Sequence, residues 1–217
     1  MNIKKIFLNL FLSFICFIIT GFGISLSIEA GIGISAFNAV IVSISQIVNI
    51  KIGTLTTIAN ILFLLAYIIL TEGKLKTKYL LQFFGVSSIG IFINYFTYNI
   101  FSKFEINNYA ISIIFLIISL FLIGISVALI LTLDSISIPV EAVCLELSKK
   151  INVSFATLRR YVDIISIIIS LLITFIFSKP LVIREGTIIS LLLFSTIIGI
   201  FHTRFEKIRF LRELKIF

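Results

Sequence analysis

Long apolar runs without a single charged residue take up most of this chain. A transmembrane helix needs about 20 mostly apolar residues, and only helices and closed barrels satisfy the backbone in lipid. The runs lack the alternation typical of barrel strands. We therefore predict an all-α integral membrane protein; its 13% of charged residues is well below the about 25% of soluble domains. The runs cover residues 6–28, 30–50, 52–71, 79–102, 106–133, 164–178 and 186–203.

Six of the predicted helices are expected to cross the bilayer. Two further segments, 36–49 and 139–150, are predicted to be short amphipathic helices that do not span it, because each has polar residues along one face. The alternative is that 30–50 also spans, giving seven helices. The six spans are predicted at about 5–28, 53–71, 79–101, 108–133, 155–178 and 184–203.

The distribution of lysine and arginine predicts the orientation. With the N-terminus inside, 14 of the 18 basic residues fall in inner segments and 4 in outer segments. Cytoplasmic loops of membrane proteins carry such an excess. Both termini are therefore expected in the cytoplasm, and the net charge of +8 requires no nucleic acid as a partner. Residues 204–217 are predicted to form a basic amphipathic helix on the inner leaflet.

The chain contains a weak internal repeat. Aligning 36–71 with 139–174 without gaps gives eight identities, and the polar matches Ser45/Ser148, Asn49/Asn152 and Thr54/Thr157 are the informative ones; the same register pairs Gly21 with Gly124. We predict repeat one at 1–103 and repeat two at 104–203. Each holds three spanning helices, an odd number, so the second must enter the membrane inverted. The predicted fold is thus six transmembrane helices in two inverted repeats, each with a short non-spanning helix.

Polar residues inside the apolar regions are candidates for a substrate site, because such groups are costly in a bilayer. They fall at equivalent positions of the two repeats, an amide in the first and an acid in the second. Alternatives remain open: a carboxylate that stabilises a helix N-terminus, a charge cluster at the cytoplasmic interface, or interhelical hydrogen bonding. The candidates are Asn38 with Glu141, Asn60 with Asp163, and Gln82 with Glu185, together with Arg159, one helical turn before Asp163.

Motifs of soluble and membrane enzymes are missing from the sequence. It contains one histidine, two cysteines among apolar neighbours and no nucleotide-binding loop or metal-ligand spacing. We expect no enzymatic activity, no metal and no cofactor.

Three short motifs resemble the YczE/YitT-like family of bacterial membrane proteins. They are Gly31-x-Gly33 before a short helix, Ser137-Ile138-Pro139 before the second short helix, and Glu185-Gly186-Thr187 at the start of the last span. The chain departs from the family pattern at Ala36, where a proline is typical. The resemblance implies a protein of the bacterial cytoplasmic membrane and indicates no substrate.

Two functions fit these observations best, and an enzyme acting on a lipid or membrane substrate through acidic residues and arginines is a third alternative. The first is a small-solute transporter with its site between inverted repeats. The second is a substrate-binding or assembly subunit of a larger membrane complex. The expected partners are the lipid bilayer and a small-molecule or ion substrate, and homo-oligomerisation is left open.

Overall fold

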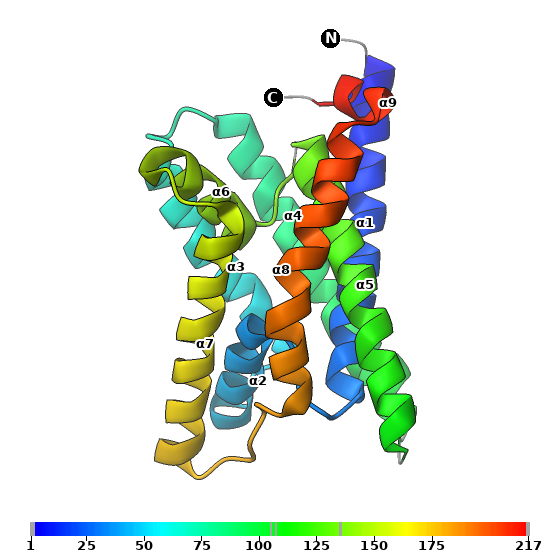
Figure 1. Cartoon of the computed structure of the whole chain (residues 1–217), viewed down its shortest axis with the longest axis vertical. Helices are drawn as coiled ribbons and strands as arrows, with labels where there is room; N and C mark the ends of the chain where they lie inside the picture. Colours follow the sequence, from blue (N-terminus) through cyan, green and yellow to red (C-terminus); the bar gives the residue numbers. More distant parts are fainter. Residues whose placement is uncertain (1–2, 105, 107, 135, 216–217) are drawn as a thin grey trace.

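The computed structural model describes residues 3–104, 106, 108–134 and 136–215, and every regular element in these ranges is helical (Figure 1). Turns of π-helix (Phe96–Ile100) and 3₁₀-helix (Phe101–Lys103) continue the fourth helix. The α-helices are α1 (Ile3–Glu29), α2 (Ala36–Val48), α3 (Ile52–Leu70), α4 (Lys76–Tyr95), α5 (Tyr109–Leu133), α6 (Pro139–Ile151), α7 (Phe155–Phe177), α8 (Glu185–Glu206) and α9 (Arg209–Glu213).

The prediction of six spanning helices is confirmed. Within the described residues, six helices are long and apolar enough to cross a membrane: α1, α3, α4 with its continuation to Lys103, α5, α7 and α8. The short helices α2 and α6 have 13 residues each. Thirteen residues make a helix of about 20 Å, whereas the hydrocarbon core is about 30 Å thick. The alternative of a seventh span at 30–50 is therefore wrong.

The central helices of the bundle are α1 and α5. They pack against each other, α1 also packs against α4, and α5 against α8. The remaining helices form a second group, in which α2 packs against α7 and α3 packs against α4 and α6. Helix α7 lies at the edge of the bundle in Figure 1 and is the least buried of the spans. Most of its surface is therefore available to lipid.

The two short helices occupy opposite ends of the molecule, with α6 near the end that holds both termini and α2 near the other end (Figure 1). Each ends at an asparagine in the left-handed conformation, Asn49 with φ 55° and Asn152 with φ 59°. Asparagine tolerates this conformation better than most residues and commonly ends helices. Their identity in the sequence alignment therefore has a backbone reason.

The first N–H groups of α3 donate hydrogen bonds to side chains of α4 and of its π-helical continuation. Asn94 Oδ1 accepts from the backbone N–H of Gly53 at 2.9 Å, and the hydroxyl of Tyr98 accepts from that of Ile52 at 3.1 Å. The first N–H groups of a helix have no partner within it and are costly to leave unpaired in an apolar environment. Asn94 and Tyr98 therefore act in place of an N-cap side chain.

The C-terminal segment differs from the single helix predicted over 204–217. Helix α8 continues to Glu206, the chain turns, and the short α9 ends at Glu213. The side chain of Asn9 in α1 donates to the carbonyls of Leu133, at 3.1 Å, and Leu214, at 2.7 Å, and Leu214 is buried. The chain turns after α8 because the segment that follows it docks on α1 and α5. Residues 216–217, which we predicted to belong to this helix, lie outside the described residues.

Candidate functional site

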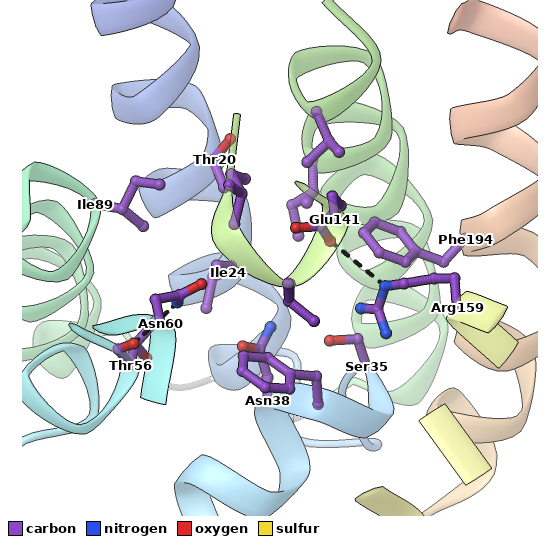
Figure 2. A pocket seen from close by; sticks show the side chains of 15 residues that line it. Thr20, Ile24, Ser35, Asn38, Thr56, Asn60, Ile89, Glu141, Arg159 and Phe194 are labelled. Atoms are coloured by element: carbon purple, nitrogen blue, oxygen red, sulfur yellow. Dashed lines mark hydrogen bonds and ion pairs between the residues drawn. The ribbon is translucent and has the colours of Figure 1, made fainter. Parts of the chain in front are cut away.

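A small cavity lies where the first turns of α2 and α6 meet the spanning helices (Figure 2). Its volume of about 50 Å³ has room for a few water-sized groups, because one water needs at least about 10–15 Å³ on this measure. Isoleucines, valines and two phenylalanines form the apolar part of its wall. The polar residues that line it are Thr20, Ser35, Asn38, Thr56, Asn60, Glu141 and Arg159.

One arginine joins two carboxylates beside this cavity. Arg159 Nη1 donates to Asp163 Oδ1 at 2.5 Å, and its Nε lies 3.4 Å from Glu141 Oε1. All three residues are buried, with 2–3% of their surface exposed. The guanidinium also lies over the ring of Phe194, 5.7 Å from its centroid, in cation–π geometry. If both carboxylates are ionised, the cluster carries one excess negative charge, because a single guanidinium faces them.

The local sequence explains how these charges are positioned. Arg159 and Asp163 are four residues apart on α7, so both side chains lie on one face of the helix. Pro139 begins α6, where its missing N–H costs nothing, and Glu141 follows in the first turn. A carboxylate is stabilised at a helix N-terminus by the helix dipole. Glu141 therefore fits the alternative of a residue that stabilises a helix N-terminus. It is also buried and forms an ion pair with Arg159.

Three side-chain oxygens around the cavity have no hydrogen-bond partner among the residues that the structure describes. They are Thr20 Oγ1 on α1, Asn60 Oδ1 on α3 and Glu141 Oε2 on α6. The amide nitrogen of Asn60 donates to the backbone carbonyl of Thr56 at 2.9 Å, which leaves its oxygen free to accept from another group. Buried polar atoms are rarely left unpaired, because desolvation is costly. These oxygens are therefore suited to a donor or a cation held in the cavity.

Four of the seven predicted site residues line the cavity: Asn38, Asn60, Glu141 and Arg159. A fifth, Asp163, is connected to it through Arg159. The neighbouring Arg160 is exposed, so an interfacial cluster of Arg159, Arg160 and Asp163 does not form.

The structure places the other two predicted site residues, Gln82 and Glu185, away from the cavity lining. Gln82 is fully buried within α4. Glu185 begins α8 and is exposed, with its carboxylate 3.8 Å from Arg184. Of the three residue pairs matched by repeat register, Asn38 and Glu141 line the cavity together, Asn60 lines it without Asp163, and neither Gln82 nor Glu185 is part of its lining.

The sequence analysis missed several residues. Thr20, Ser35 and Thr56 line the cavity, yet hydroxyl residues are frequent in membrane helices because they can bond to their own backbone. A second ion pair also went unnoticed: buried Lys78 on α4 lies 2.6 Å from Asp134 at the end of α5. The sequence could not indicate that Lys78 and Asp134 form a pair, because 56 positions separate them.

Comparison with family models assigns most of the chain to one family. The model of DUF6198, described as a family of unknown function, matches residues 7–203. No curated protein and no solved structure matches the chain.

Proposed function

Because the chain belongs to DUF6198, a family of unknown function, we propose its activity from its own residues: it is a small-solute transporter that binds a small cation in the cavity beside Arg159. The observation that carries this proposal is the combination of unpaired oxygens and excess negative charge. Oxygens of Thr20, Asn60 and Glu141 from three helices face one buried space. Amide, hydroxyl and carboxylate oxygens bind cations and ammonium groups.

The charge balance favours a cation over an anion. With Glu141 and Asp163 both ionised, the buried cluster holds two negative charges against the one positive charge of Arg159. An uncompensated charge in a low-dielectric interior is costly. A bound ammonium ion, metal cation or proton removes the imbalance, whereas an anion doubles it. The cavity volume of about 50 Å³ restricts the solute held in this conformation to one of ammonium or methylammonium size.

We also propose that the transporter consists of two inverted repeats, with α1–α4 corresponding to α5–α8. Replacing each helix by its counterpart turns the pair α2–α7 into α6–α3 and the pair α1–α4 into α5–α8. In each of these four pairs the two helices pack against each other. A Cβ at Gly21 would come within 2.7 Å of Phe92 in α4, and one at Gly124 within 2.5 Å of Ile197 in α8. Equivalent glycines thus allow close approach at equivalent helix crossings.

The position of the cavity agrees with such an architecture. The first turns of the two short helices, with Asn38 and Glu141, line the same space from opposite ends of the molecule (Figures 1 and 2). In transporters with inverted repeats, broken or short helices end near the bilayer midplane and bind the solute there. Movement of one repeat against the other would then open the cavity to each side in turn.

We further propose that the protein resides in a bacterial cytoplasmic membrane with both termini in the cytoplasm. The excess of basic residues in the segments assigned to the inside supports this orientation. Both termini lie at the same end of the molecule, as six spans require (Figure 1).

Solid-supported membrane electrophysiology tests the proposed transport. Proteoliposomes of the wild type should give transient currents on jumps of ammonium or methylammonium, and Glu141→Gln should give no more than empty liposomes. Glu146→Gln is the matched control, because Glu146 lies on the same helix but pairs with Lys149 outside the cavity lining, at 3.6 Å. The proposal fails if ammonium, methylammonium, Na⁺ and K⁺ all give no current, or if Glu141→Gln behaves as the wild type.

A further inference from the structure

A second hollow, which shares Phe37 with the polar cavity, is almost entirely apolar. It has a volume of about 380 Å³, within the range of small-molecule sites. Residues from α2, α3 and α7 line it, and Ser166 is the only one with a polar side chain. Leu62 on α3 and Ile165 on α7 are more than half exposed, so this groove opens to the lipid-facing surface.

Phe37 forms part of both the groove and the polar cavity. It lies in the first turn of α2, next to Asn38, and lines each of the two spaces. Its ring meets that of Phe63 on α3 edge to face, with centroids 5.8 Å apart. The wall between the lipid-facing groove and the charged cavity therefore includes a side chain that can change rotamer without moving the backbone.

The groove also runs beside the other charged and amide residues of the site. Val162 lines the groove and precedes Asp163, and Ala59 lines it and precedes Asn60. On a helix, consecutive side chains point about 100° apart, so each pair presents one residue to the groove and the next toward the interior. An apolar path thus lies along the flank of the cavity that Glu141 and Arg159 line.

We propose that the solute is an amphiphilic cation, a primary or substituted ammonium with an apolar chain, which enters sideways from the bilayer through this groove. The proposal rests on the cation transport proposed above and specifies its substrate class. The chain occupies the groove, while the cationic head passes Phe37 and reaches Glu141. The excess negative charge disfavours the phosphate head of an ordinary phospholipid, which can place only its acyl chain in the groove.

Such an entry route has a physical advantage for this solute. In lipid an apolar chain gains little by moving to another apolar surface, so the chain can stay in the groove at low cost. The ammonium head is the group that is costly in the bilayer, and the carboxylates of Glu141 and Asp163 offset that cost. The head group therefore drives binding, and the groove keeps the chain in apolar surroundings.

Binding of alkylammonium ions to the full chain in lipid nanodiscs tests this inference, with empty nanodiscs subtracted. With affinity referred to the free ion in water, octylammonium should bind about tenfold or more tightly than methylammonium, because its bound chain lies in apolar surroundings whereas its free chain is in water. Ile165→Trp, which fills the groove, should remove that advantage and leave methylammonium binding unchanged. Leu62→Trp on the opposite wall provides a second variant with the same expectation. Glu141→Gln should weaken binding of both ions.

The outcomes separate the two proposals. If methylammonium binds in a Glu141-dependent way but octylammonium binds no more tightly, or if both tryptophan variants retain the advantage, sideways entry is wrong and cation transport stands. If octyl sulfate binds as tightly as octylammonium, the groove holds lipid chains without selecting a cation, and the inference is overturned. If neither ammonium ion binds, the proposed cation site is wrong as well.

Discussion

Arg159 on α7 lies 3.4 Å from Glu141 on α6, and this ion pair joins a lipid-facing span to the first turn of a short helix. The same guanidinium bonds to Asp163. Three buried charges thus depend on one another, so the removal of any one changes the solvation cost of the other two.

Removal of the arginine should be strongly destabilising. Arg159→Met leaves two carboxylates buried without a counter-charge, and loss of one partner of a buried pair costs about 3–5 kcal/mol. A thermal unfolding assay in detergent should show a clear fall in melting temperature. Arg160→Met is the control, because Arg160 is exposed and should change stability little. Adding Glu141→Gln and Asp163→Asn to Arg159→Met should restore part of the lost stability. If the Arg159→Met protein is as stable as the wild type, the ion pairs do not stabilise the fold.

Glycine at two helix crossings should be required for tight packing. Gly21→Ala and Gly124→Ala place a methyl group within 3 Å of Phe92 and Ile197, respectively, and overpacking costs about 1–3 kcal/mol. Gly199→Ala is the control, since no neighbouring atom in the described part of the chain lies within 4 Å of the position of its Cβ. We expect the melting temperature to fall for Gly21→Ala and Gly124→Ala and to stay unchanged for Gly199→Ala. Opposite results at positions 21 and 124 would count against equivalent crossings in the two halves.

The ends of the two short helices should respond alike to substitution. Asn49→Ala and Asn152→Ala force alanine into a left-handed conformation, at a cost of about 1–2 kcal/mol. The glycine variants at the same positions should be close to the wild type, because glycine adopts positive φ freely. The measurement is again the melting temperature, and equal stability of the alanine and glycine variants would refute the backbone argument.

Topology can be measured with cysteine reporters in a Cys16→Ala, Cys144→Ala background. Leu75→Cys should be protected from an impermeant maleimide added outside intact cells, and Phe104→Cys should be labelled. The reason is the excess of basic residues near the first position. A reporter at residue 216, outside the described residues, is also expected to be protected. Labelling at residue 75 from outside would reverse the proposed orientation.

The sequence was most informative about the spanning helices and the charges between them. Apolar length alone sets the number of spans, and charged residues such as Arg159 must find partners because lipid cannot solvate them. Thr20 and Thr56 could not be distinguished in the same way, because a threonine in a membrane helix is inexpensive wherever it points. The end of α8 was also missed, since neither glycine nor proline occurs at positions 207 and 208.

The hydrogen bonds of Asn9 have a consequence for how the protein is made. This side chain in α1 binds carbonyls of Leu133 and Leu214, residues that a ribosome adds 124 and 205 positions later. During synthesis, α1 therefore enters the membrane with an amide whose final acceptors have not yet been translated. The amide of Asn9 therefore gains one acceptor when α5 has been made and the second only when the segment after α9 follows it, so the hydrogen bonds of this side chain are completed late in assembly.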